Sequence, residues 1–348
     1  MKTRPIRVLV VDDSAFARKV MREVLERDPR FEVVGIARDG LDALEKITDL
    51  TPDVVTLDLV MPNLDGVGVL RALGGLGLAR LPRVVVVSMS EEDSDLAVAA
   101  LQLGAIDLVR KPTALATDRL FELAGELIAK VAAAAGATSV AAYASVPAGP
   151  AAGAPLRATA TSRRIVVIGA STGGPQALTM LLAQMPKEFP APIAVVLHMP
   201  VGYTEALSRR LDQACAIEVV EAHEGVELRP GRAVIARAGM HLRLTRGEPA
   251  VGRLDFTPLD KPHRPSVDVL FQSAAEVFGA SALGVVLTGM GDDGLLGARA
   301  LRAADAPVLT EAESSCVVYG MPRSVKEAGL STGEATLDRM ADAIQKQK

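Results

Sequence analysis

The sequence predicts an α/β protein of two domains, each built on a mostly parallel sheet covered by helices. Apolar runs rich in β-branched residues alternate with segments of helical apolar spacing over residues 1–130, and again over residues 163–348. Between them, residues 131–162 are rich in Ala, Gly, Pro, Ser and Thr and contain one charged side chain, which predicts a linker. Aromatic residues make up only 3% of the chain and hydrophobic residues 49%, so aliphatic side chains must form both cores, as in parallel sheets buried by helices.

The first domain repeats a strand followed by a helix five times. Residues 6–11 form a continuous apolar run with a β-branched bias, and Phe16, Val20 and Val24 recur after it at helical spacing. The same alternation predicts further strands at residues 31–37, 54–59, 84–87 and 107–110, and further helices at residues 41–47, 67–73, 96–103 and 118–133.

The second domain resumes this alternation but has a different middle part. Between residues 217 and 256 the pattern changes to short strands separated by turns, which indicates an antiparallel edge or a hairpin excursion. Around that part we expect strands at residues 165–168, 193–197, 283–287 and, as the last short strand, 308–309, and helices at residues 176–184, 204–215, 267–278 and 294–303.

Charge and cysteine content exclude several classes of protein. The net charge is −4, and residues 163–348 hold 20 Lys and Arg against 21 Asp and Glu, so no basic surface for nucleic acid is expected. Cys215 and Cys316 lie in no metal-binding or disulfide pattern, which favours two free thiols in a reducing cytosol. The N-terminal apolar run is too short for a signal peptide, and the weakly charged stretch 131–156 is broken by Gly and Pro. We therefore expect a cytoplasmic protein without membrane insertion.

Acidic residues and a lysine follow successive strands of the first domain. Asp12 and Asp13 follow the first predicted strand, Asp58 ends the third, Ser88 follows the fourth, and Lys111 follows the fifth. The carboxyl ends of parallel strands share one crevice, so these side chains should converge there. Three carboxylates in one crevice need a divalent cation, and hard oxygen ligands suit Mg²⁺, with the lysine able to neutralise a phosphoryl oxygen. The alternative is a set of helix caps and solvated strand ends, for which Asp-Asp-Ser is also a good sequence.

A serine follows the first strand of the second domain, in IVVIGASTGGPQAL. Ser171 lies between a strand and a helix whose first turn contains Pro175, where free amides and the helix dipole favour negative charge. Residues 169–173 also match G-x-S-x-G, the pattern of a tight turn that exposes a serine nucleophile. The competing interpretation is a turn that cradles a phosphate, although the segment is neither G-x-G-x-x-G nor a P-loop.

A histidine and two aspartates are expected at the same sheet edge. His198 ends the strand of IAVVLHMP and can act as a general base for Ser171, while a structural histidine is the alternative. Asp292 and Asp293 follow another strand in LGVVLTGMGDDGLLG, and a carboxylate there can orient the imidazole or, alternatively, cap the next helix. A buried amide in the turn 288–291 can help to hold an oxyanion. The order Ser, His, Asp differs from that of α/β-hydrolases. Cys215, late in a predicted helix, is the weaker nucleophile candidate.

Residues 5–130 resemble the receiver domain of bacterial response regulators, in the segments VLVVDDS, LDLVMPNLDG, VVVVSMS and GAIDLVRKP. The resemblance implies a flavodoxin-like (CheY-like) fold that is phosphorylated by a histidine kinase of the chemotaxis type. Receivers usually have an aromatic residue where this chain has Leu108, so switching is expected to be weaker or to depend on packing alone. The site residues that the resemblance implies are Asp58 as phosphoacceptor, Ser88 and Lys111 as switch and phosphate-binding residues, and Asp12, Asp13, Asp58 and the Val60 carbonyl around Mg²⁺.

The second domain resembles the CheB family of protein-glutamate methylesterases, in the segments GASTGG, HMP, HRPSVDVLF and LTGMGDDG, in that order. The resemblance implies a doubly wound, mostly parallel α/β fold over residues 163–348. It also implies that residues 263–266 form a loop that shapes substrate entry without taking part in the reaction. Many relatives have Asn where this chain has Asp292, which favours its neighbour as the triad acid. The implied roles are Ser171 as nucleophile, His198 as general base, Asp293 as orienting acid, Thr172 as supporting hydroxyl and the Met290 amide as oxyanion donor.

Together the two resemblances imply a phosphorylation-regulated esterase. The implied substrates are methyl esters of glutamyl side chains on methyl-accepting chemoreceptors, with deamidation of receptor glutamines by the same route and no cofactor in the esterase site. Two alternatives remain open at this point. One is a receiver joined to a docking module whose glycine turns merely bind an anion, and the other is a related esterase that acts on a protein outside chemotaxis.

Overall fold

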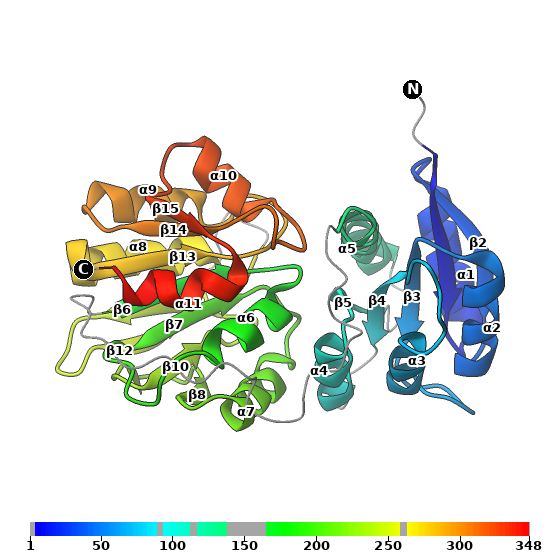
Figure 1. Cartoon of the computed structure of the whole chain (residues 1–348), viewed down its shortest axis with the longest axis horizontal. Helices are drawn as coiled ribbons and strands as arrows, with labels where there is room; N and C mark the ends of the chain where they lie inside the picture. The colour runs from blue at the N-terminus through cyan, green and yellow to red at the C-terminus, as the bar shows by residue number, and fades with distance from the viewer. Residues whose placement is uncertain (1–3, 89–92, 112–116, 138–164, 258–262, 348) are drawn as a thin grey trace. The chain divides into compact units, whose positions relative to one another are not determined.

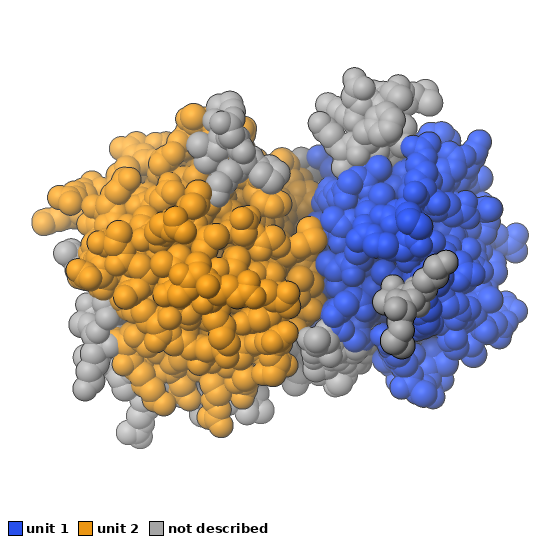
Figure 2. Space-filling view, turned by 90° about the horizontal axis from the view of Figure 1, so that it is seen from above, with its two compact units in different colours: residues 1–146 blue, residues 147–348 orange. Residues whose placement is uncertain are grey.

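The structure is a computed structural model that describes residues 4–88, 93–111, 117–137, 165–257 and 263–347, with the side chains of residues 117–123 left out. The chain divides into two compact units, Met1–Val146 and Pro147–Lys348, which Figure 2 shows in two colours. The division falls inside the expected linker, of which residues 138–162 lie outside the described residues, as does Pro112. Helix α5 (Thr117–Ala135) includes the first five residues of the expected linker, 131–135.

The N-terminal unit has a five-stranded parallel sheet in the order β2-β1-β3-β4-β5, which confirms the predicted fold (Figure 1). Every strand of this sheet except β2 is almost wholly buried, because continuous Val and Leu runs are covered by helices on both faces. The strands are β1 (Ile6–Val11), β2 (Phe31–Ala37), β3 (Val54–Asp58), β4 (Arg83–Ser88) and β5 (Asp107–Arg110), and the helices before α5 are α1 (Ala15–Glu26), α2 (Gly40–Leu50), α3 (Gly66–Leu73) and α4 (Ser94–Gln102).

Short polar side chains fix where three of these helices begin. The Ser14 hydroxyl accepts from the Ala17 amide at the start of α1, Asp39 accepts from the Asp42 amide at the start of α2, and Asp65 accepts from the Gly68 amide at the start of α3. Side-chain oxygens at this position satisfy amides that have no partner inside the helix. The DDS segment therefore begins a helix, which confirms the capping interpretation for Ser14, while the role of its acids in a metal site stays a prediction.

The C-terminal unit has a seven-stranded parallel sheet in the order β15-β14-β13-β6-β7-β10-β8. Within this unit the first strand is the central strand β6 (Ile165–Ala170). The sheet then grows through β7 (Ile193–Leu197) to one edge, and later through β13 (Ala282–Val286) to the opposite edge. The sheet thus reverses its direction of growth at β6, and such switch points form the crevice where α/β sheets bind ligands. The remaining strands of this sheet are β8 (Glu218–Glu221), β10 (Arg232–Ile235), β14 (Val308–Glu311) and β15 (Gly333–Ala335).

Helices cover this sheet in two groups. Helices α6 (Gly174–Leu182), α7 (Thr204–Ala214) and α11 (Leu337–Gln345) lie side by side (Figure 1). Helices α8 (Val267–Phe278), α9 (Leu295–Ala303) and α10 (Met321–Glu327) form the second group, in which α8 also packs on β11 (His241–Thr245). No helix within the described ranges is both long and apolar enough to cross a membrane.

Two details of the second domain differ from the prediction. The segment 217–256 does not form one antiparallel unit, because β8 and β10 extend the parallel sheet, while β9 (Val226–Glu227), β11 and β12 (Val251–Asp255) form a separate antiparallel sheet. The strand expected at 308–309 is not the last one, since α10, β15 and α11 follow it. β15 was missed because it has only three residues, GEA, without an apolar run.

Candidate functional site

Three catalytic candidates follow three adjacent strands of the seven-stranded sheet. Ser171 comes directly after β6, His198 directly after β7, and Asp293 lies in the turn between β13 and α9. β6 is hydrogen-bonded to both of the other strands, and the His198 amide donates to the Ala170 carbonyl at 3.2 Å. The structure therefore brings together residues up to 122 positions apart on one rim, at the switch point of the sheet.

The imidazole and the carboxylate form a direct pair. His198 Nε2 lies 2.9 Å from Asp293 Oδ2, and both side chains are largely buried. His198 Nδ1 is buried and has no hydrogen-bond partner among the described residues. In the familiar serine hydrolase arrangement the acid binds Nδ1 and Nε2 serves as the base. Here the two ring nitrogens have exchanged places, because the acid contacts Nε2. Within the same residues Ser171 makes no hydrogen bond to His198, and Nδ1 is the ring nitrogen that remains available for a serine proton.

Asp293 is held by the start of helix α8, not by its own helix. Its Oδ2 accepts from the Val267 amide at 2.7 Å, and its Oδ1 accepts from the Ser266 hydroxyl at 2.9 Å and from the Asp268 amide at 3.1 Å. Burial acts to raise the pKa of Asp293, but the His198 contact and these donors outweigh it, so the pKa lies below its usual range. The carboxylate is therefore ionised and fixed, as an orienting acid must be.

A second aspartate, Asp268, makes the reciprocal contact between helices α8 and α9. Asp268 Oδ1 accepts from the Gly294 amide at 2.9 Å and from the Gly297 amide at 2.7 Å, at the start of α9. Each aspartate thus caps the helix that belongs to the other, which locks α8 and α9 together beneath the site. The expectation that Asp293 could cap its own helix is wrong, because Asp268 does so. Asp292, the neighbouring acid, is exposed.

The segment that was expected only to shape substrate entry contacts the triad candidates directly. The His263 ring stacks on the His198 ring with centroids 4.0 Å apart and planes 14° from parallel. Ser266, in the same segment, donates to Asp293. The role of the segment in substrate entry stays a prediction, and this set of contacts was not expected from the sequence. The signal that could have found it is the pair of polar residues placed just before an apolar helix.

The nucleophile turn packs tightly against the turn that follows β13. The Ser171 amide donates to the Thr288 carbonyl at 3.0 Å, and the Thr288 hydroxyl donates to the Thr172 carbonyl at 3.0 Å. Gly289 must lack a side chain, because a Cβ there would lie 2.7 Å from the Ser171 Cβ. The next amide, that of Met290, donates to no acceptor among the described residues. A free amide beside the nucleophile is what an oxyanion donor requires, and the role of Met290 stays a prediction.

Gly173 has a φ of 79° and is the N-cap residue just before α6, so the chain turns sharply after the serine. Thr172 is buried, and its role as a supporting hydroxyl also stays a prediction. Burial raises the pKa of the Cys215 thiol to about 12, so this cysteine is a poor nucleophile and a serine-based reaction is favoured.

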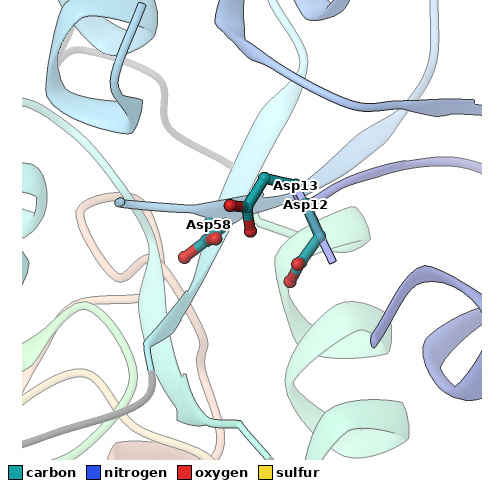
Figure 3. Close-up of side chains that lie close together, drawn as sticks. All are labelled: Asp12, Asp13 and Asp58. Carbon is teal, nitrogen blue, oxygen red and sulfur yellow. The ribbon is translucent and has the colours of Figure 1, made fainter. Parts of the chain in front are cut away.

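The acidic cluster of the N-terminal unit lies at the corresponding edge of its own sheet. Side-chain oxygens of Asp12, Asp13 and Asp58 lie within 4.8 Å of one another, and Figure 3 shows the three carboxylates gathered together. Lys111 Nζ lies 2.8 Å from Asp12 Oδ2 and 2.7 Å from Asp58 Oδ2. Burial raises the pKa of Asp58 above its usual range, although Lys111 opposes this. Burial disfavours the charged lysine too, but the two carboxylates outweigh it and raise the pKa of Lys111.

The remaining receiver candidates lie around this cluster. Ser88 is buried at the end of β4, and its carbonyl accepts from the Lys111 amide at 2.7 Å. The Val60 amide lies 3.3 Å from Asp58 Oδ1, and the Val60 side chain is exposed. Leu108, at the usual aromatic position, is buried in β5, and its carbonyl accepts from Lys130 Nζ at 2.6 Å. The roles of these residues in switching stay predictions.

Comparison with known families assigns both units. Residues 166–344 match the family described as CheB methylesterase, and residues 8–123 match the response regulator receiver domain. The crystal structure of the Thermotoga maritima CheB methylesterase catalytic domain aligns with a TM-score of 0.52 and 40% identity, over 53% of this chain and 97% of that one.

Full-length relatives agree with this assignment. The protein-glutamate methylesterase/protein-glutamine glutaminase 5 of Myxococcus xanthus is 62% identical over 343 residues, covering 98% of each chain. A protein of the same name, without a number, from Symbiobacterium thermophilum is 45% identical over 357 residues, covering 98% of this chain and 96% of that one. The chain therefore belongs to the CheB methylesterase family, with a response regulator receiver domain ahead of its catalytic domain.

Proposed function

We propose that this protein hydrolyses methyl esters of glutamyl side chains on methyl-accepting chemoreceptors, which yields glutamate and methanol, and that it deamidates receptor glutamines at the same site. The names of the full-length relatives support both activities. The observation that supports the reaction most directly is the pairing of His198 Nε2 with a buried, firmly held Asp293, which leaves Nδ1 for the proton of the serine. We assign the receiver to residues 1–130 and the catalytic domain to residues 163–348.

The first half of the reaction forms an acyl-enzyme. Ser171 Oγ attacks the ester carbonyl carbon, and His198 Nδ1 accepts the serine proton. The negative charge that develops on the carbonyl oxygen is stabilised by the Met290 amide. Asp293 stabilises the imidazolium without taking its proton. When the tetrahedral species collapses, the bond from carbon to the methoxy oxygen breaks, and the imidazolium gives its proton to the leaving methanol.

The second half repeats these steps with water. His198 removes a proton from water as it attacks the acyl carbon, and then returns that proton to Ser171 Oγ as the ester bond to the enzyme breaks. The free enzyme and a carboxylic acid result, and the acid ionises to glutamate by releasing its proton to water, so atoms and charges balance. For a glutamine substrate ammonia leaves in place of methanol, with the same proton transfers. The receptor chain supplies the binding energy that holds the ester against the serine.

The receiver is proposed to regulate this reaction. A histidine kinase of the chemotaxis type donates the phosphoryl group to Asp58, and Ser88 and Lys111 contact the phosphoryl oxygens. The oxygens of Asp12, Asp13 and Asp58, within 4.8 Å of one another, are hard ligands that fit Mg²⁺, with the Val60 carbonyl as a further ligand. Mg²⁺ supplies positive charge to the transferred phosphoryl group. The substrates and the kinase place this activity in the cytoplasm.

Methanol release from methylated receptor membranes tests the esterase proposal. Wild type should release methanol, and Ser171→Ala should lower kcat by several orders of magnitude, because triad serines contribute about 10⁶-fold. Cys215→Ser is the control and should keep the wild-type rate. An active Ser171→Ala variant would contradict the proposal.

Regulation is tested separately with acetyl phosphate and Mg²⁺. Phosphorylation of Asp58 should raise the rate of methanol release, and Asp58→Asn should be insensitive to the phosphodonor. Asp65→Asn, which alters an acid that only caps helix α3, is the control and should respond like wild type. An unchanged rate after complete phosphorylation of Asp58 would contradict the regulatory part alone.

A further inference from the structure

A fully buried carboxyl group lies behind the nucleophile turn and has no role in the mechanism above. Glu311 is the last residue of β14 and is 0% exposed. Its Oε2 accepts from the Thr288 amide at 2.8 Å, and its Oε1 lies 3.0 Å from the Ser315 hydroxyl. Among the described residues no Lys, Arg or His pairs with it, and burial raises its pKa above the usual range.

The hydrogen bonds around Glu311 can all be made when its carboxyl group is protonated. The Ser315 hydroxyl accepts from the Leu337 amide at 3.0 Å and has a single proton to donate. A neutral Glu311 donates to Ser315 Oγ, which then donates to the Ala312 carbonyl 3.2 Å away. An ionised Glu311 would be a buried charge without a cation, held only by neutral donors, namely the Thr288 amide, the Ser315 hydroxyl and the Cys316 thiol, and this is costly.

The charged groups nearby do not compensate a negative charge on Glu311. Cys316 follows in the same loop, and burial next to Glu311 raises the pKa of its thiol. Glu313, further along this loop, pairs with Arg323 of α10 at 3.8 Å. Glu334, on the neighbouring strand β15, forms an ion pair with Lys326 of α10. Both cations of α10 are thus engaged by other acids.

Glu311 is connected to the reacting residues through one residue, Thr288. The Thr288 amide binds Glu311, the Thr288 carbonyl binds the Ser171 amide, and the Thr288 hydroxyl binds the Thr172 carbonyl. Two residues further on lies the free amide of Met290. A shift of the Thr288 peptide would therefore displace the nucleophile and the oxyanion donor together.

We propose that Glu311 is a neutral positioning residue that fixes the turn at residues 288–290, and through it the Ser171 hydroxyl and the Met290 amide. The carboxylic acid acts as an amide-like group, with one oxygen that accepts and one that donates. This inference rests on the proposed esterase reaction for its kinetic consequence, but its protonation state can be tested without any substrate.

The protonation state is tested by thermal unfolding of the full chain at pH values from about 5 to 8. Since the folded protein keeps a proton that the unfolded chain releases near pH 4.3, wild-type stability falls as pH rises above that value. Glu311→Gln has the same shape and no proton to lose. Its Tm minus the wild-type Tm should increase steadily from pH 5 upward, whereas Glu313→Gln, on the same loop, should give a constant difference. A constant or decreasing difference for Glu311→Gln would overturn the proposal.

The positioning role is tested by kinetics with two variants of similar volume. Glu311→Met leaves the Thr288 amide without an acceptor, and kcat should fall by roughly 10- to 100-fold at unchanged KM, a fraction of what the loss of a whole oxyanion donor costs. Glu311→Gln, which restores an acceptor for Thr288 and a donor for Ser315, should return kcat to near the wild-type value.

These outcomes separate this inference from the esterase proposal. A wild-type chain without methanol release defeats the proposed function and leaves the unfolding result to decide the state of Glu311. Equal kcat for wild type and Glu311→Met, or loss of kcat in Glu311→Gln as large as in Glu311→Met, would overturn the positioning role.

Discussion

The two domains place acids at the same edge of the same kind of sheet but treat them in opposite ways. In the receiver, Asp12, Asp13 and Asp58 lie together, and the nearest cation, Lys111, is shared between two of them. In the catalytic domain, Asp293 stands against one histidine and accepts two backbone amides and a hydroxyl. The pKa of Asp58 lies above the usual range because of burial, and that of Asp293 lies below it although burial opposes this.

The difference shows that hydrogen-bond donors, not burial alone, decide what a carboxylate at such an edge can do. Both side chains are nearly inaccessible, with Asp58 3% and Asp293 5% exposed. Asp58 has one weak backbone donor at 3.3 Å and shares the Lys111 ammonium with Asp12, so few fixed donors offset the effect of its burial. Asp293 has its lone pairs occupied by the start of α8, so it remains ionised and fixed beside the imidazole. The receiver carboxylates thus have few fixed donors, whereas the carboxylate of Asp293 is held ionised beside His198.

The largest effect that tests this difference between the two sites is expected when the charge of Asp293 is removed. We expect Asp293→Asn to lower kcat by about 10⁴-fold, because an amide cannot stabilise the imidazolium and offers the ring a wrong hydrogen-bond partner. Methanol release under saturating substrate measures this, and phosphorylation of Asp58 should stay at the wild-type level. Asp292→Asn is the matched control and should retain kcat, so an equal loss in both variants would contradict the assignment.

The next effect concerns the donors that hold Asp293. Ser266→Ala removes a hydrogen bond to a buried carboxylate, which should lower the free energy of unfolding by about 1.5–3 kcal/mol at pH 7. A lowered folded pKa stabilises the protein above the unfolded value of about 3.9, and this contribution is lost as pH falls through the folded pKa. The difference between wild type and variant should therefore shrink in acid.

Urea unfolding at about pH 7 and at a series of pH values below about 3.9 measures this difference. Ser324→Ala, which removes only a hydrogen bond to the neutral Met321 carbonyl, is the control and should give a smaller, pH-independent loss. A loss in Ser266→Ala that does not change with pH would mean that its hydroxyl does not act through the charge of Asp293.

How far the sequence predicts these two sites depends on the kind of contact. Asp58, Ser171 and His198 were found because each follows a buried strand, and parallel strands must end on one side of the sheet. Strand patterns and glycine turns are local signals. Their meeting point then follows from topology, so the fold class and the candidate residues at both edges could be deduced without coordinates.

Contacts that depend on helix packing could not be deduced in the same way. The exchange of caps between Asp268 and Asp293 needs α8 and α9 to lie side by side, and no local pattern specifies that pairing. The reversed imidazole of His198 follows from where Asp293 is held, which is a consequence of this packing. Glu311 lies two residues beyond the strand expected at 308–309, and its burial depends on α11 and the loop after β14, which no local pattern indicates.

In the receiver, the corresponding test removes the charge of Lys111, which Asp12 and Asp58 share. Lys111→Met should bind Mg²⁺ roughly tenfold more tightly than wild type, since a unit charge a few ångströms away repels the ion by about 1–4 kcal/mol. Phosphorylation from acetyl phosphate should nevertheless become slower, because the lysine no longer neutralises the phosphoryl oxygens. Titration calorimetry with Mg²⁺ measures the affinity.

Lys19→Met, in an exposed pair with Glu23, is the control and should leave Mg²⁺ affinity unchanged. Weaker Mg²⁺ binding in Lys111→Met would show that the lysine organises the carboxylates more than it competes with the ion. The receiver acids would then resemble Asp293, held by fixed donors, and the contrast between the two edges would fail.

The smallest expected effect tests whether the catalytic imidazole is held by its stacked neighbour. His263 lies face to face with His198 at 4.0 Å, an arrangement worth about 0.5–1.5 kcal/mol for an aromatic pair. His263→Ala should therefore lower kcat by roughly 2- to 10-fold, while His263→Phe, which keeps a ring but no nitrogen, should retain most of it. If His263→Phe loses as much activity as His263→Ala, the nitrogen atoms of His263 take part in proton transfer, and the site uses two histidines where the triad needs only one.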